Sequence, residues 1–187
     1  MAATLISLDD VKIKFHNFAG GPLPWDPNNT KKTLTILVSD EQVETLQKAG
    51  VTSVKPGYIN PNYPDAEPEN RLPINIQYNT DRATGAKWGP SVHMYIEGDP
   101  VPVELTEDTI GQLDDAYILK TSVVLSLHKW SVNGKSGANV YLKELYVVIR
   151  KNRYADEFAK YSSASAGSPD SGADELALNV KSDKLPF

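Results

Sequence analysis

The sequence predicts a mainly β domain, folded as a small barrel of about five to seven strands with two or three short helices. Alternating apolar and polar residues recur in short runs, long Gly- and Pro-rich segments separate them, and the run lengths are irregular. Irregular strands with long loops favour a small barrel over a regular sandwich. We expect this domain at residues 1–161 and a disordered, mildly acidic tail at residues 162–187.

The first predicted strands lie at residues 11–18 and 31–39, where apolar residues occupy every second position. Val11, Ile13 and Phe15 are expected to face the core. The residues between them are basic, so the opposite face of this strand should be positively charged.

A capping pattern predicts the first helix. Ser39 followed three positions later by Gln42 forms a capping box. Val43 and Leu46 then give the helix an apolar stripe, and Gly50 is expected to end it.

The middle of the chain is predicted to combine loops with two strands. Residues 54–73 hold five prolines and are expected to form a long surface loop. Strands follow at residues 74–79 and 91–98, and a loop that carries Trp88 joins them. Residues 105–116 fit a short helix capped by Thr106.

The longest β region is predicted at residues 120–130 and 140–150. The connection holds Asn133-Gly134, a dipeptide typical of tight hairpin turns. A last helix is expected at residues 151–161, before the Ser-, Ala- and Gly-rich tail.

The charge is unevenly distributed along the chain. The net charge is −5, from 19 basic and 24 acidic residues. Residues 116–160 hold 8 basic and 3 acidic residues, a local net charge of +5, in an otherwise acidic chain. For binding, this distribution matters more than the total. The chain has no cysteine, export signal or long apolar run, so we expect a soluble, cytoplasmic protein without disulfides.

Motifs for catalysis and for cofactors are absent from the sequence. His16, His93 and His128 lie far apart and lack the spacing of metal ligands. Asp114 and Asp115 are neighbours on a predicted helix and are expected to be solvated. We therefore predict no enzyme activity, no catalytic residue, no metal and no cofactor.

Aromatic and basic residues instead indicate a surface for single-stranded nucleic acid, whose bases stack on rings while lysines follow the phosphates. The predicted DNA-binding residues are Lys12, Lys14, His16, Trp25, Trp88, His128, Lys129, Trp130, Lys135, Tyr141 and Lys143. Tyr58 and Tyr63 in the proline-rich segment are further aromatic candidates. Structural alternatives stay open: Trp130 could cap the core, Trp25 and Trp88 could anchor loops, and the lysines could be ordinary solvated side chains.

Three segments resemble the phage-encoded single-stranded DNA-binding proteins of tailed bacteriophages. They are Phe15-His16-Asn17-Phe18-Ala19-Gly20, the acidic stretch at residues 105–118, and Trp130-Ser131-Val132-Asn133-Gly134-Lys135-Ser136-Gly137 with its return strand. The resemblance covers most of residues 11–150. It implies an OB-fold (oligonucleotide/oligosaccharide-binding) barrel that coats single strands, with little sequence preference, during phage replication, recombination and repair in the cytoplasm of the infected host.

The chain ends in Pro-Phe, as do the acidic tails of bacterial single-stranded DNA-binding proteins. The resemblance implies that Asp183, Leu185, Pro186 and Phe187 recruit replication or recombination proteins; a merely solubilising tail is the alternative. The oligomeric state stays open between monomer and dimer. Two rival functions also stay open: a module that binds carbohydrate or protein on the same barrel, and a structural phage protein.

Overall fold

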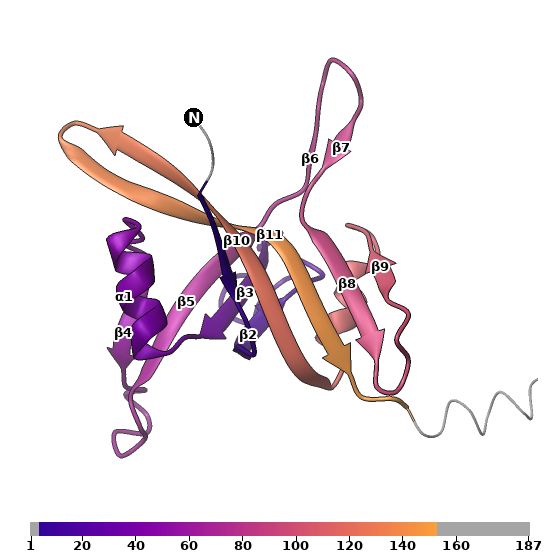
Figure 1. Cartoon of the computed structure of the whole chain (residues 1–187), viewed down its shortest axis with the longest axis horizontal. Helices are drawn as coiled ribbons and strands as arrows, with labels where there is room; N and C mark the ends of the chain where they lie inside the picture. Colours follow the sequence, from indigo (N-terminus) through magenta and orange to yellow (C-terminus); the bar gives the residue numbers. More distant parts are fainter. Residues whose placement is uncertain (1–3, 153–187) are drawn as a thin grey trace, which may run out of the picture. The chain divides into compact units, whose positions relative to one another are not determined.

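The structure, a computed structural model, describes residues 4–152 and is mainly β, as predicted (Figure 1). This part of the chain holds eleven strands, one α-helix and one short 3₁₀ helix. The strands are β1 (Thr4–Leu8), β2 (Lys12–Asn17), β3 (Lys32–Leu37), β4 (Lys55–Tyr58), β5 (Glu69–Ile76), β6 (Asn79–Thr80), β7 (Lys87–Trp88), β8 (Ser91–Ile96), β9 (Val103–Leu105), β10 (Ile118–Val132) and β11 (Lys135–Ile149). The helices are α1 (Asp40–Lys48) and η1 (Ile110–Asp114).

One curved sheet carries the fold, in the strand order β1-β10-β11-β5-β3-β2. Its neighbours pair antiparallel, except that β5 and then β8 pair parallel to β11. Among residues 4–152 no ladder joins β2 to β10, and the two ends of the sheet meet where Val11 N donates to Thr121 O (2.9 Å). The arrangement is therefore an OB-like sheet with an open seam between β2 and β10.

The core lies inside this curved sheet and is closed at one end by α1. Val43 and Leu46 of α1 are buried, as predicted. Both hydrogen bonds of the capping box are present, because Gln42 N donates to Ser39 Oγ (3.3 Å) and Ser39 N donates to Gln42 Oε1 (2.8 Å).

The expected inward position of Phe15 is wrong. The pairing of β2 with β3 shifts by one residue between Ile13 and Phe15. A bulge of this kind reverses the alternation of a strand beyond it. Val11 is therefore buried as predicted, whereas Phe15 is 55 % exposed.

Three further expectations need correction. The proline-rich segment contains strand β4 and the start of β5, in which Pro73 pairs with β3 alone, an edge-like setting that tolerates proline. The predicted helix at residues 105–116 reduces to η1, whose N-cap is Thr109 and not Thr106. The predicted loop around Trp88 contains the two-stranded hairpin β6–β7.

Strands β1 and β9 were not predicted at all; each is short and lies at an edge of the sheet. The predicted helix at residues 151–161 and the tail lie outside the described residues. Within residues 4–152 no helix has the length and apolar character needed to cross a membrane.

Candidate nucleic-acid interface

Two hairpins project from the same side of the sheet (Figure 1). One is the far half of β10–β11, which closes with the two residues Asn133 (φ 51°) and Gly134 (φ 77°), both left-handed, as in a type I′ turn. The other is β6–β7, which leaves the sheet after β5 and returns as β8 on the same edge of β11. The long strands β10 and β11 thus continue into one hairpin, and the second hairpin lies between β5 and β8.

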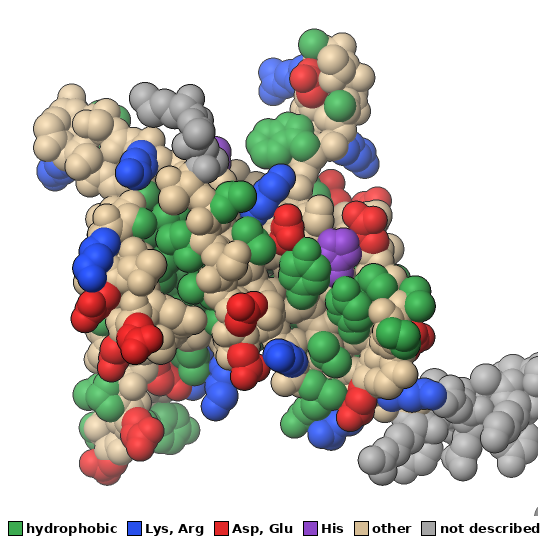
Figure 2. Space-filling view, in the orientation of Figure 1, with side chains coloured by type: hydrophobic (Ala, Val, Ile, Leu, Met, Phe, Trp, Pro, Cys, Tyr) green, Lys and Arg blue, Asp and Glu red, His purple; other side chains and the backbone are tan. Residues whose placement is uncertain are grey.

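Both hairpins carry basic side chains, which Figure 2 shows in blue near their tips. Lys129 and Lys135 lie on β10–β11, and Arg82 and Lys87 lie on β6–β7. Asp81, at the tip of β6–β7, accepts hydrogen bonds from Ala83 N (2.7 Å) and Thr84 N (3.1 Å). These backbone hydrogen bonds lower the pKa of Asp81. The ionised carboxylate therefore stabilises the turn.

A groove of about 470 Å³ opens on the sheet surface between the hairpins. It is lined by Leu5, Gln77, Trp88, Gly89, Ser126, His128, Tyr141, Leu142 and Lys143. Four predicted DNA-binding residues meet here: Trp88, His128, Tyr141 and Lys143. No carboxylate belongs to this lining, so the groove pairs apolar surface with one cation.

Neighbouring side chains hold the aromatic rings of the groove. His128 lies edge-on to Tyr141, with ring centroids 5.1 Å apart, and His128 Nε2 is 3.2 Å from Ser126 Oγ. Trp88 faces them from β7 and is 61 % exposed. Much of the Trp88 ring is therefore open to a ligand.

Tyr78 fixes the base of the β6–β7 hairpin. A Cβ placed on Gly89 would come within 2.3 Å of the Tyr78 ring, so only glycine allows this contact. Burial, with a smaller contribution from Glu107, raises the pKa of Tyr78 to about 12. The Tyr78 hydroxyl thus stays uncharged. The contact between Tyr78 and Gly89 holds the preceding residue, Trp88, at the edge of the groove.

Trp130 does not cap the core. It lies on the projecting part of β10, is 37 % exposed, and rests on Gly137 of β11, where an added Cβ would be 2.8 Å from its ring. With Lys129 and Lys48 it lines a second hollow of about 430 Å³ on the hairpin stem. The predicted residues Lys129, Trp130 and Lys135 therefore extend the aromatic and basic surface along this hairpin.

The other predicted residues lie away from the groove. Lys12, Lys14 and His16 line a hollow at the seam between β2 and β10. Lys14 Nζ forms an ion pair with Glu69 (2.7 Å), and His16 Nδ1 lies 2.9 Å from Asp114 Oδ1. Trp25, in the loop after β2, is 79 % exposed and does not line the groove. The tail residues Asp183, Leu185, Pro186 and Phe187 lie outside the described residues.

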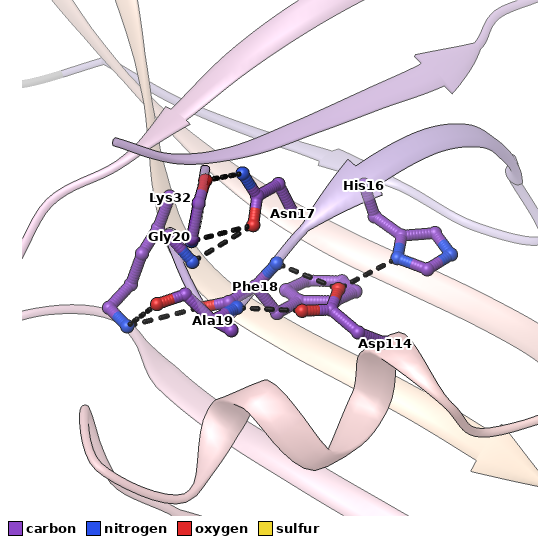
Figure 3. A network of polar contacts seen from close by, with 8 residues as sticks. His16, Asn17, Phe18, Ala19, Gly20, Lys32 and Asp114 are labelled. Atoms are coloured by element: carbon purple, nitrogen blue, oxygen red, sulfur yellow. Dashed lines mark hydrogen bonds and ion pairs between the residues drawn. The ribbon is translucent and has the colours of Figure 1, made fainter. Parts of the chain in front are cut away.

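Asp114 and Asn17 hold the turn after β2 (Figure 3). Asp114 accepts hydrogen bonds from Phe18 N and Ala19 N (both 2.8 Å), and Asn17 Oδ1 accepts from Gly20 N (3.0 Å) and Gly21 N (3.1 Å). Burial alone would raise the pKa of Asp114, but the hydrogen bonds from Phe18, His16 and Ala19 outweigh it and lower that pKa. The expectation that Asp114 is solvated is therefore wrong.

Sequence reasoning missed Leu5, Gln77 and Ser126 as parts of the groove. Leu5 belongs to the unpredicted strand β1, whose register places it opposite Ser126. Ser126 in turn is paired with Tyr141. The alternation that puts Ser126 on the face of His128 was visible in the sequence, whereas the pairing partners were not.

Comparison with protein families gives a match over residues 2–179 to a family described as "Putative phage ssDNA-binding domain". No curated protein matches the chain.

Among solved structures, the chain is similar to the single-stranded DNA-binding protein of bacteriophage Enc34. A C-terminal truncation of that protein matches at 18 % identity and a TM-score of 0.44, over 79 % of this chain and 86 % of the other. Its complex with ssDNA matches at 16 % and 0.44, over 76 % and 85 %. The single-stranded DNA-binding protein gp2.5 of bacteriophage T7 matches at 13 % and 0.39, over 84 % and 98 %.

Proposed function

The chain belongs to the phage ssDNA-binding domain family, and we propose that it holds single-stranded DNA in the groove between its two projecting hairpins. The observation that carries this proposal is the meeting of Trp88, His128, Tyr141 and Lys143 in one groove, although they come from three different strands.

The chemistry of the groove suits a single strand with little sequence preference. Every base has a π-face, so exposed rings such as Trp88 and Tyr141 accept any of them by stacking. Lys143 in the groove and the lysines on the β10–β11 hairpin neutralise phosphates along the strand. A duplex keeps its bases stacked inside, so it cannot use the rings in this way.

The proposed role is to coat and protect single strands during phage DNA replication, recombination and repair, in the cytoplasm of the infected host. Family membership supports this role. We propose that the domain binds without catalysing a reaction. The tail residues Asp183, Leu185, Pro186 and Phe187 are proposed to recruit partner proteins.

Titration with oligo-dT tests the groove. We expect Trp88→Ala and Tyr141→Ala each to weaken binding about 10-fold, because a stacked base contributes about 1–3 kcal/mol. Bound DNA should quench tryptophan fluorescence, and less so in Trp88→Ala. The matched control is Tyr117→Ala, which removes an exposed ring (62 %) that precedes β10, at the opposite end of that strand from the groove.

Unchanged affinity in both groove variants would contradict this site. The same titration at increasing salt separates DNA from the rival ligands, because phosphate binding weakens as salt rises. Affinity that does not depend on salt would favour a carbohydrate or an uncharged protein surface.

A further inference from the structure

A second set of aromatic and basic side chains lies on β2, β4 and β5. We propose that Phe15, Tyr58 and Arg71 form a second stacking station, which receives the same DNA strand after it leaves the groove. This inference rests on the proposed function, because the station extends the path of a strand that the groove already holds.

The guanidinium of Arg71 organises the station. Its Cζ lies 4.0 Å from the ring centroid of Tyr58 and 5.3 Å from that of Phe15. Glu69 fixes the guanidinium through Arg71 Nη2 (2.8 Å) and Nε (3.1 Å). The same carboxylate accepts from Lys14 Nζ (2.7 Å), and these two partners, Lys14 first, lower the pKa of Glu69. Both rings are thus held in place before any ligand arrives.

Phe15 presents its ring at the surface beside Arg71. At 55 % exposed it is one of the large apolar side chains that remain open on the described surface. The bulge in β2 turns it outward, and bulges often re-aim a side chain at a binding site. Arg71, only 13 % exposed, supports the ring from one side.

The surroundings of the station are positively charged. In the register of the sheet, Lys12 pairs with Leu37, Leu37 with Arg71, and Arg71 with Lys55. Paired residues share a face, so three cations form one row across four strands. Lys14 adds a fourth cation. Two carboxylates accompany this row: Glu69, which pairs with Lys14 and Arg71, and Asp40, which accepts from Asn70 Nδ2 (2.6 Å). An anionic chain with stacking groups fits this surface better than an apolar protein partner does.

The station and the groove share one face of the sheet. Ser126 pairs with Tyr141, Tyr141 with Asn75, and Asn75 with Thr33 of β3. Arg71 lies four residues before Asn75 on β5, with unbroken register, so both side chains point the same way. At about 3.3 Å per residue, Arg71 and Asn75 are about 13 Å apart along β5, and Phe15 lies two strands further across the sheet at about 4.8 Å per strand. OB-fold sites of about 4–16 nucleotides cover such a span.

Oligonucleotides of two lengths test the station in the full chain, one of about 4 and one of about 16 nucleotides. We expect Phe15→Leu, which keeps the apolar character but removes the ring, to weaken binding of the long oligonucleotide about 10-fold. Binding of the short one, held in the groove, should not change. Phe15→Trp should restore the affinity and add fluorescence that only the long oligonucleotide quenches.

Lys55→Gln supplies a measurement that does not depend on stacking. The slope of log affinity against log salt for the long oligonucleotide should become shallower by about 0.7, as expected for one lost phosphate contact on a single strand. Val103→Ala is the control for removing exposed apolar surface from a strand (46 % exposed, on β9).

The proposal of a second station would be wrong if Phe15→Leu bound the long oligonucleotide with full affinity and Lys55→Gln left the salt slope unchanged. Under that outcome Trp88→Ala would still weaken binding if the groove is correct. If Trp88→Ala and Tyr141→Ala both bind normally, it is the groove that fails. The two proposals are therefore separated by which variants lose affinity.

Discussion

Asp114 links two parts of the chain that are about a hundred residues apart. It precedes β10, yet its carboxylate receives the backbone N–H groups of Phe18 and Ala19 and the ring of His16. The motif Phe15-His16-Asn17-Phe18-Ala19-Gly20 therefore has a structural component: Asn17 and Phe18 are buried and shape the turn. Phe15 and His16 of this motif remain exposed.

We predict that Asp114→Asn lowers the free energy of unfolding at pH 7 by about 2 kcal/mol, because hydrogen bonds to a charged acceptor are lost. The folded-state pKa of Asp114 is lowered, so its contribution is present above the pKa of the unfolded chain and disappears as pH falls through the folded-state pKa. Urea unfolding of both proteins should thus converge in acid. Asp115→Asn is the control, and a difference that persists at low pH would contradict this role.

Trp130 and Trp88 show that the burial of an aromatic residue must be known before it is assigned to the core or to a binding surface. The Trp130 ring rests on Gly137, whereas Gly89, the residue after Trp88, leaves room for the Tyr78 ring. Neither tryptophan belongs to the core of the described domain. The alternative that Trp130 caps the core is therefore wrong, and the assignment of both rings to stacking stays a prediction.

At the scale of elements, the β6–β7 hairpin is the part whose placement matters most for binding. It leaves the sheet after β5 and rejoins β11 as β8, so its orientation depends on the contact of Tyr78 with Gly89. A short hairpin of two-residue strands has little pairing of its own.

We predict that Gly89→Ala shifts this hairpin and lowers the free energy of unfolding by about 1–3 kcal/mol, because the new methyl group would overlap the Tyr78 ring. The affinity for oligo-dT should fall as well, since Trp88 moves with the hairpin. Thermal unfolding and anisotropy measure the two effects. Gly21→Ala, where a Cβ meets nothing within 4 Å, is the control; equal behaviour of the two variants would refute the contact's role.

Some elements were predictable because their signals are local. The capping box of α1 and the turn at Asn133-Gly134 depend on residues within a few positions of each other, and both are confirmed. The sequence predicts β5 only from residue 74 onward. The earlier part is missed because proline argues against a strand with partners on both sides, whereas Pro73 pairs only with β3. The predicted alternation of β2 is wrong at Phe15, because no local signal in the sequence marks the bulge.

At the scale of the whole described domain, the groove is kept clear of acidic residues. The net charge is −5, yet the groove lining holds no carboxylate, and both projecting hairpins carry cations. This separation lets an acidic protein bind an anionic polymer.

We predict that deleting Asp183–Phe187 leaves the affinity for single-stranded DNA unchanged or raises it, because the groove and the station belong to residues 4–152. The same deletion should abolish co-purification of replication or recombination proteins. Anisotropy and pull-down from infected cells measure the two properties. A deletion that weakens DNA binding would contradict the division between tail and domain.

The sequence alone determined the β class, the two long strands, the capped helix and the basic segment, because periodicity, capping and charge are properties of neighbours in the chain. Its resemblance to phage single-stranded DNA-binding proteins agrees with the family match. Only the tertiary structure decided which aromatics share a surface. Strand register brings Trp88, His128 and Tyr141 together, and a one-residue bulge exposes Phe15 beside Arg71. Pairing between distant strands sets both, and no local pattern encodes it.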